Sequence, residues 1–368
     1  MRRFQSARSG AVSLALFAMA AAAPMALARD EITRSFPFNP GETLRLRSDR
    51  GHIELRRAAT SQVTVTVGIE DATLADYLKV TFEDTPEGLR IDGKQRGGFL
   101  SGWFSGWFGE SREVQFVVEV PEKLNADLET GGGHIQLVDI EGTVNLETSG
   151  GHIRFETVTG DLTAHTSGGH IKGQHVTGIG ALDTSGGHIS VGEADRDLKV
   201  HTSGGHITIG TVHGVLDAST SGGNIEVQEV AGAMDLHTSG GNIEAAECGG
   251  DAEVSTSGGD ITLGGMRGHV TAKTSGGDLK VVLAAGNAAG ADLSTSGGSV
   301  ALEVPPGIGF KIDARASGAT VDARLPQMKV EGTPGKDHLE AVVGAGGSLL
   351  RVRSTQGEIR ISETAAHQ

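Results

Sequence analysis

The sequence predicts an all-β fold, a single-stranded parallel β-solenoid of 18-residue coils with irregular capping coils at both ends. Three observations predict it. A tetrapeptide recurs at a fixed step, apolar residues alternate with polar ones between the recurrences, and glycine occupies 57 of 368 positions, about twice its average usage. Because the step is short and fixed, each recurrence marks one stacked structural unit and not part of an ordinary globular core.

The recurring tetrapeptide is Thr-Ser-Gly-Gly, and its threonines stand 18 residues apart from Thr148 to Thr274. A Thr-Gly-Gly-Gly variant begins one step earlier, at Thr130. Each Gly pair is followed by one polar residue and one aliphatic residue. The polar position holds, in chain order, His134, His152, His170, His188, His206, Asn224, Asn242, Asp260 and Asp278. Glycine that recurs in step with the frame predicts turns and not disorder.

Two short strands are expected in each coil, because apolar residues alternate with polar ones both after the Gly pair and before the next threonine. Helices are excluded, since glycine this dense would cost about 1 kcal/mol per site. Coils stacked about 4.8 Å apart place equivalent aliphatic residues in ladders that form the core. The threonine column is expected to face inward, with neighbouring hydroxyls bonded to one another. Cys248 falls in a core column and is expected to be inert, and as the one cysteine it cannot form an internal disulfide.

Two other solenoid types fit the pattern poorly. A left-handed hexapeptide helix needs aliphatic residues six apart, which these columns do not supply. Calcium-binding nonapeptide rolls need a Gly-Gly-x-Gly-x-Asp motif every nine residues, whereas here the Gly pair occurs once in 18.

Residues 1–28 are predicted to be a secretory signal peptide. Arg2, Arg3 and Arg8 precede an apolar run over 11–27, and residues 26–28 form a small-x-small cleavage site. An uncleaved membrane anchor is the alternative, disfavoured because the run is short, alanine-rich and broken by Pro24. We therefore expect export through the Sec pathway to the periplasm or cell surface. Cleavage removes three arginines and changes the formal net charge from −15 to −18, which disfavours nucleic acid as a partner.

Three further regions follow the signal peptide. Residues 29–120 are predicted to be an N-terminal β capping region, 121–304 the regular solenoid, and 305–368 irregular C-terminal coils and a tail. The frame of the repeat also occurs outside the regular array, before it at Ser48 to Ile53 and after it at Ser354 to Ile359. Terminal coils are expected to be irregular, because they must cover open strand edges.

The strand blocks before the array, the step Val120-Pro121 and the run of Thr-Ser-Gly-Gly-x-Ile units together resemble the bacterial putative-adhesin family. The resemblance covers most of the mature chain. It implies a right-handed parallel β-solenoid at the cell envelope, and it carries over no catalytic residues to this chain.

The histidine ladder is the first candidate site. His134, His152, His170, His188 and His206 are expected to point outward about 4.8 Å apart, so neighbouring rings could share zinc, copper or nickel. A second outward column alternates His165, His201 and His237 with residues such as Asp183. The alternative is a solvated column that arose by duplication and binds no cofactor. Repulsion between neighbouring imidazolium rings predicts pKa values below about 6.5, and loosening of the ladder in acid.

The aromatic loop over residues 97–109 is the second candidate site. It contains a tandem Ser-Gly-Trp-Phe with Trp103, Phe104, Trp107 and Phe108, the chain's only two tryptophans among them. An exposed aromatic segment of this kind could contact a membrane interface, a protein or a glycan. Alternatively, the loop could fold over the open end of the solenoid.

Catalysis is not expected, because the regular coils admit no long loops that would wall a cleft. The sequence therefore predicts a non-enzymatic, exported β-solenoid that binds or adheres at the cell envelope, with a protein or glycan partner. The alternative is a metal- or pH-responsive periplasmic protein that uses the histidine columns. A binder of ice or crystal faces is disfavoured, because it needs outward threonine arrays. The regular coils predict a stiff rod of roughly 40 Å.

Overall fold

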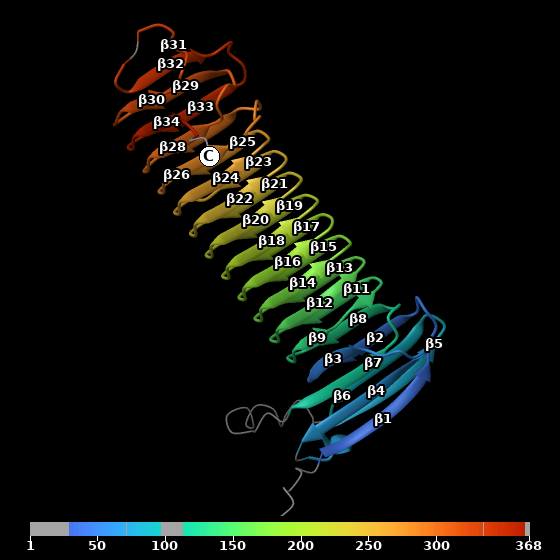
Figure 1. Cartoon of the computed structure of the whole chain (residues 1–368). Helices are drawn as coiled ribbons and strands as arrows, with labels where there is room; N and C mark the ends of the chain where they lie inside the picture. The colour runs from blue at the N-terminus through green and yellow to red at the C-terminus, as the bar shows by residue number, and fades with distance from the viewer. Residues whose placement is uncertain (1–28, 71, 97–112, 334, 365–368) are drawn as a thin grey trace, which may run out of the picture.

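The computed structural model describes residues 29–70, 72–96, 113–333 and 335–364. They form an elongated rod of stacked coils with the N-terminal region at one end and the C-terminal region at the other (Figure 1). Each regular coil contributes strands to two long sheets, here called sheet A and sheet B. Within the described residues the only helix is the single turn α1 (Leu74–Tyr77), so the predicted all-β solenoid is confirmed. The predicted signal peptide and aromatic loop lie outside the described residues.

Successive coils pair in parallel with a constant offset, as Ile189 pairs with Ile207 and Leu198 with Leu216. In sheet A the strands of the array are β9 (Ile135–Leu137), β10 (Ile140–Glu141), β12 (Ile153–Thr159), β14 (Ile171–Val176), β16 (Ile189–Ala194), β18 (Ile207–Val212), β20 (Ile225–Val230), β22 (Ile243–Cys248), β24 (Ile261–Met266), β26 (Leu279–Leu283) and β28 (Val300–Val304). In sheet B they are β8 (Asn125–Thr130), β11 (Val144–Thr148), β13 (Leu162–Thr166), β15 (Gly180–Thr184), β17 (Leu198–Thr202), β19 (Leu216–Thr220), β21 (Met234–Thr238), β23 (Ala252–Ser255), β25 (Val270–Thr274) and β27 (Ala291–Thr295).

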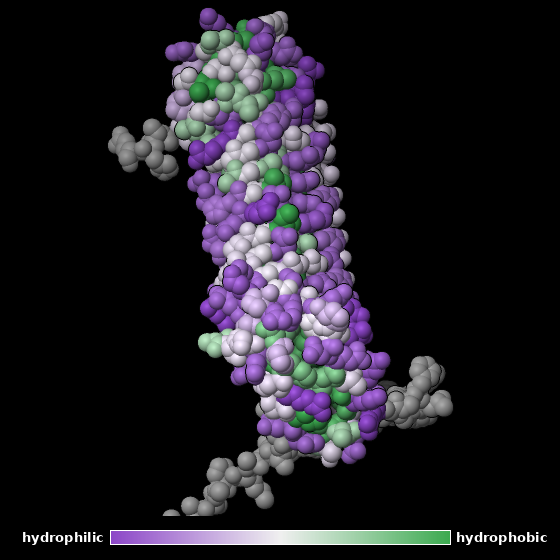
Figure 2. Space-filling model, turned by 90° about the vertical axis from the view of Figure 1, so that its right-hand side faces the viewer, coloured by the Kyte–Doolittle hydropathy of each residue, from purple (hydrophilic) through white to green (hydrophobic). Residues whose placement is uncertain are grey.

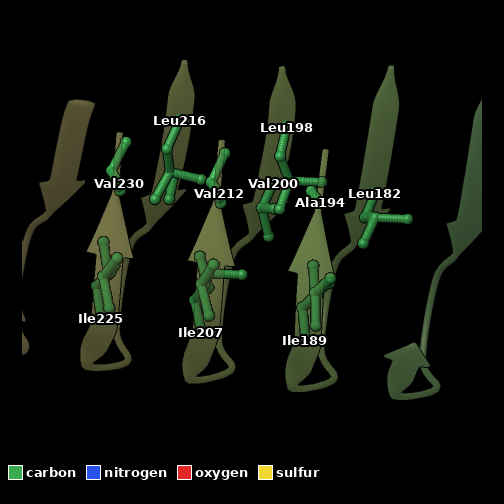
Figure 3. Close-up of a cluster of buried hydrophobic side chains, with 14 of the residues drawn as sticks. Leu182, Ile189, Ala194, Leu198, Val200, Ile207, Val212, Leu216, Ile225 and Val230 are labelled. Atoms are coloured by element: carbon green, nitrogen blue, oxygen red, sulfur yellow. The ribbon is translucent and has the colours of Figure 1, made fainter. Parts of the chain in front are cut away.

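The core lies between the two sheets and consists of aliphatic ladders. Figure 3 shows Ile189, Ile207 and Ile225 in one row on sheet A, with leucines of sheet B such as Leu198 facing them. All of these side chains are buried. Cys248 is buried in the same core, where desolvation raises the pKa of its thiol, as expected for an inert residue. Burial of one continuous apolar column by stacking is what holds a repeat architecture together.

The threonine column is buried as predicted, but the expectation that its hydroxyls bond to one another is wrong. Thr202 Oγ1 donates to the carbonyl oxygen of Gly187 at 2.9 Å and accepts from the N–H of Gly205 at 3.2 Å. The same two bonds recur from Thr148 to Thr274. The chain leaves the strand ladder at this corner, so the hydroxyl satisfies two buried backbone groups that the ladder does not reach.

Both ends of the rod place a coil distant in sequence directly against the regular array. Near the N-terminus, β2 (Thr43–Ser48) and β3 (His52–Arg57) pair with β8 and β9 on one side. Their other side pairs with β6 (Gly88–Gln95) and β7 (Val114–Val120).

The C-terminal end repeats this arrangement. There β33 (Leu349–Ser354) and β34 (Ile359–Glu363) stack on β27 and β28, and β29 (Phe310–Ala316) and β30 (Val321–Arg324) lie outside them. The first and last coils of the chain are therefore each held between two others.

Antiparallel strands cover the outermost coils. At the N-terminal end β4 (Gln62–Glu70) pairs with β7 and with the edge strand β1 (Arg29–Pro37), and β5 (Leu78–Thr85) pairs with β6. At the C-terminal end β32 (His338–Val343) joins β29 to β31 (Met328–Val330). These strands pair the open edges that parallel stacking leaves. Among the described residues, no helix is both long enough and apolar enough to cross a bilayer.

Candidate functional site

The histidine ladder is a continuous stack of imidazole rings at the corner before the strands of sheet A. Ring centroids of successive histidines from His134 to His206 lie 4.8–5.0 Å apart with nearly parallel planes. His52 extends the stack by one ring, 4.7 Å from His134, because β3 stacks on β9. The sequence analysis did not place His52 in the ladder, although its frame, Ser48 to Ile53, was the signal for it.

Each ring of the ladder is tied to the backbone of the next coil. The N–H of His152 donates to Nδ1 of His134 at 2.8 Å, and the N–H of His170 donates to Nδ1 of His152 at 2.8 Å. The series continues up to the N–H of Asn224, which donates to Nδ1 of His206 at 2.9 Å. An imidazole that accepts at Nδ1 is neutral and carries its proton on Nε2.

The drift of the column from histidine to asparagine and aspartate follows from this bond. Oδ1 of Asn224 accepts from the N–H of Asn242 at 3.0 Å, and Oδ1 of Asp260 accepts from the N–H of Asp278 at 2.8 Å. All three residue types place an acceptor at the δ1 position of a short side chain. The column is therefore a ladder of δ1 acceptors that satisfies corner N–H groups, whichever of the three residues a coil carries.

This geometry bears on the predicted metal site. The Nδ1 lone pair of each ring is used by the backbone, and the proton on Nε2 occupies the other nitrogen. A metal ion would have to displace either the backbone N–H group from Nδ1 or the proton from Nε2. Zinc, copper or nickel binding by the ladder therefore stays a prediction that these hydrogen bonds oppose.

The predicted lowering of the ladder pKa values is found at two rings. Desolvation by burial lowers the pKa of His134, and the charges of the adjacent His52 and His152 lower it further. The pKa of His188 is lowered by desolvation first and then by His170 and His206. Protonation would also remove the Nδ1 acceptor that bonds to the N–H of the next coil. Acid would therefore weaken the ladder both by charge repulsion between the rings and by loss of these hydrogen bonds.

The second histidine column lies on the outer face of sheet B. His165 Nδ1 forms an ion pair at 2.7 Å with Asp183 when protonated. His201 and His237 instead bond through Nδ1 to Ser219 and Ser255, each at 2.9 Å. These histidines pair with the neighbouring coil one by one and do not converge on a shared point.

Acidic side chains from neighbouring coils stand side by side on both outer faces. On sheet B, Asp235 pairs in register with Glu253, and on sheet A Glu226 pairs in register with Glu244. Burial raises the pKa of Asp235, and the charges of Glu253 and Asp217 raise it further. Figure 2 shows that the rod is largely hydrophilic along the regular coils, with hydrophobic residues gathered mainly near its two ends.

The structure also brings together a group that the sequence analysis missed. Nε2 of His175 lies 2.9 Å from Oδ1 of Asp195, and Nε2 of His213 lies 3.2 Å from Oε1 of Glu193. These four residues come from three successive coils. The predicted aromatic site, Trp103, Phe104, Trp107 and Phe108, lies outside the described residues.

Comparison with known proteins gives one family and several distant structures. The sequence profile of the Toastrack DUF4097 family matches residues 42–362. A putative cell adhesion protein from Clostridium sporogenes is 11% identical, with 92% of this chain and 100% of that chain covered and a TM-score of 0.21. A putative adhesin from Bacteroides fragilis is 13% identical, with 91% and 97% covered and a TM-score of 0.25. A putative lipid binding protein from Parabacteroides distasonis is 11% identical, with the same coverage and a TM-score of 0.24. No curated protein matches the chain.

Proposed function

The chain belongs to the Toastrack DUF4097 family, and from that premise and the geometry of its coils we propose that it is a non-enzymatic binding or adhesion module of the cell envelope. The predicted signal peptide supports export, and the module would act in the periplasm or at the cell surface. It would present its outer faces to an envelope protein or glycan.

The observation that carries this proposal is the uniformity of the coils. In the coil from β15 to β16, the corner occupies only residues 185–188, and the turn between β14 and β15 occupies only residues 177–179. Binding and catalytic residues are usually carried on loops that a scaffold positions, and loops this short cannot wall a cleft. The surface that remains for recognition is the pair of long, polar outer faces.

Charge narrows the chemistry of the partner. The sequence carries 46 acidic and 31 basic residues, and acids from adjacent coils stand together on both faces. Such a surface repels anionic lipid and nucleic acid over its length. We therefore expect a partner that offers neutral or cationic groups, and binding that weakens as salt rises.

Co-sedimentation with isolated bacterial envelopes tests the proposal. We would compare the tag-free mature chain with two variants that each neutralise a pair of adjacent acids in the same part of the rod. One variant carries Asp235→Asn and Glu253→Gln on sheet B, and the other carries Glu226→Gln and Glu244→Gln on sheet A. We expect saturable binding, weakened by more than about threefold in one variant and unchanged in the other, which identifies the binding face.

Two results would contradict the proposal. One is wild-type protein that stays in the supernatant at all salt concentrations. The other is binding that neither salt nor either variant changes, since it would not involve these faces.

A specific observation favours a second candidate, a pH-responsive periplasmic protein. The neutral rings of the ladder hold successive coils through Nδ1, and the pKa values of His134 and His188 are already lowered. Acid would protonate the rings and loosen the corner column. The melting experiment in the Discussion tests this candidate.

The aromatic loop is proposed as a further point of contact. The chain enters this segment from β6, which ends at Gln95, and returns through β7, which begins at Val114. Both strands belong to the N-terminal end of the rod (Figure 1). Trp103 and Trp107 would contact a membrane interface or a partner.

A further inference from the structure

Three potential metal ligands meet on one outer face of the rod, and a fourth stands beside them on the next coil. His175 lies near the end of β14 and Glu193 near the end of β16. Asp195 directly follows β16, and His213 directly follows β18. The potential ligand atoms of His175, Glu193 and Asp195 all lie within 4.8 Å of one another. His213 joins the group through its contact with Glu193. We call these four residues the His–carboxylate cluster.

The backbone fixes the positions of the cluster. His175 pairs in register with Glu193 in the parallel ladder. The N–H of Asp195 donates to the carbonyl of Val176 at 3.0 Å, and the N–H of His213 donates to the carbonyl of Ala194 at 2.9 Å. Val176 and Ala194 point into the core, so the cluster residues beside them point outward. The side chains are therefore held close by the stacking of rigid coils and not by a mobile loop.

The cluster differs from the histidine ladder in what its nitrogens contact. In the ladder, backbone N–H groups occupy Nδ1, whereas in the cluster Nε2 of His175 and of His213 both face a carboxylate oxygen. Across the described part of the chain, no other group of three histidine, cysteine or acidic residues brings its ligand atoms this close. The cluster therefore differs from the rest of the described rod both in its potential ligand atoms and in how close together they lie.

The donor set matches zinc. Two imidazole nitrogens and two carboxylate oxygens are ordinary zinc ligands, and two negative charges balance one divalent cation. A tetrahedral site with bonds of 2.0–2.2 Å needs ligand atoms about 3.3 Å apart. The ligand atoms of His175, Glu193 and Asp195 already lie within 4.8 Å of one another. Nε2 of His213 lies 3.2 Å from Glu193 alone, so its exposed side chain must turn toward the other three to complete the site. The presence of nitrogen donors favours zinc over magnesium or calcium.

We propose that the His–carboxylate cluster binds one zinc ion per chain, with His175, Glu193 and Asp195 as ligands and His213 as the fourth once its side chain turns toward them. The ion would replace two hydrogen bonds with bonds that join three successive coils at one outer face. This inference does not rest on the proposed binding function, because the rod could bind zinc whether or not it adheres to an envelope.

Calorimetric titration of zinc chloride into the tag-free, metal-free mature chain tests the proposal. The cluster variant carries His175→Asn and His213→Asn. The matched control, here called the ladder variant, carries asparagine in place of His134, His152, His170, His188 and His206. Asparagine preserves the δ1 acceptor of the ladder, as Asn224 and Asn242 do naturally, so the control is expected to fold.

We expect one zinc per wild-type chain, a loss of affinity of more than about tenfold in the cluster variant, and unchanged binding in the ladder variant. Asp195→Asn alone should weaken binding as well and provides a second variant if the first fails to fold. Wild-type protein without zinc binding overturns the proposal, as does binding that the cluster variant retains. Loss in the ladder variant alone overturns it too and assigns the metal to the stacked rings.

Discussion

Replacement of Gly205 by alanine tests whether close approach of the coils explains the second glycine of each corner. A Cβ at this position would lie 1.8 Å from the carbonyl oxygen of Gly187 and 2.8 Å from the backbone nitrogen of His188. Both atoms belong to the backbone of the stacked coil, so neither can rotate away. At Gly204, the first glycine of the same pair, a Cβ would meet nothing closer than 3.8 Å, which makes Gly204→Ala the matched control.

The expected cost of Gly205→Ala follows from this overlap. The coils must separate locally by more than about 1 Å, and overpacking of this kind costs about 1–3 kcal/mol even when side chains can adjust. Separation also breaks the bond of Thr202 to Gly187 of the neighbouring coil, which adds about 1 kcal/mol. We therefore expect a loss of at least about 2 kcal/mol for Gly205→Ala, against less than about 1 kcal/mol for Gly204→Ala.

Thermal unfolding followed by circular dichroism measures the difference. For a chain of this size we take about 2 °C per kcal/mol, which gives a melting temperature lower by at least about 4 °C in Gly205→Ala. Hydrogen exchange should show faster exchange in the coils on both sides of the substitution and unchanged exchange at the rod ends. Equal melting temperatures for the two variants would refute the reasoning, because only one of them introduces a backbone overlap.

Three further predictions concern the corner columns and the aromatic loop. Thr202→Val should lower the free energy of unfolding by about 2–4 kcal/mol, because two buried backbone groups lose their hydrogen-bond partner. Thr202→Ser keeps the hydroxyl and should lower it by about 1 kcal/mol. A urea titration measures both losses, and equal losses would contradict the hydrogen-bonding role of the threonine. The pKa values of His134 and His188 are lower in the folded chain than in the unfolded chain, so the unfolded chain takes up protons first as the pH falls. The ladder therefore contributes its full stability above about pH 6.5, and this contribution declines below that pH. The melting temperature of the wild type should therefore fall more between pH 7.5 and pH 5 than that of the ladder variant, and parallel curves would contradict this. Since Trp103 and Trp107 are the only tryptophans, a blue shift of the emission on addition of neutral lipid vesicles would report insertion of the loop, and an unchanged spectrum would exclude it.

The features of the fold that recur in every coil could be predicted from the sequence. The Ile and Leu ladders and the buried threonine column could be read from the period alone, because every coil provides the same alternation of apolar and polar residues. The partners of the threonine hydroxyl could not be read, since they are backbone groups at a corner whose path only the folded chain defines.

The order in which the terminal coils stack was also beyond the sequence. Ser48 to Ile53 shows the frame of a coil, but any coil of this frame can stack on any other. Its contact with the array joins residues far apart, such as Arg45 and Asp127, which are 82 positions apart and form an ion pair at 2.8 Å. His52 was missed as a member of the ladder for this reason.

The His–carboxylate cluster escaped the sequence analysis for a different reason. His175 and His213 occupy different positions of the repeat, so neither forms a column of histidines that the period reveals. They meet Asp195 and Glu193 along diagonals of 20 residues, two more than the 18 of the repeat. A search for diagonal neighbours at this offset would have found them.

The central claim of this account is that the repeated corner residues stack the coils and that the outer faces of the rod bind. Co-sedimentation of the ladder variant with bacterial envelopes, beside the wild type at neutral pH, tests it most directly. Because asparagine keeps every δ1 acceptor, the account predicts binding curves that coincide. Loss of envelope binding in the ladder variant, with an unchanged melting temperature, would contradict the claim and place the binding site on the stacked imidazole rings.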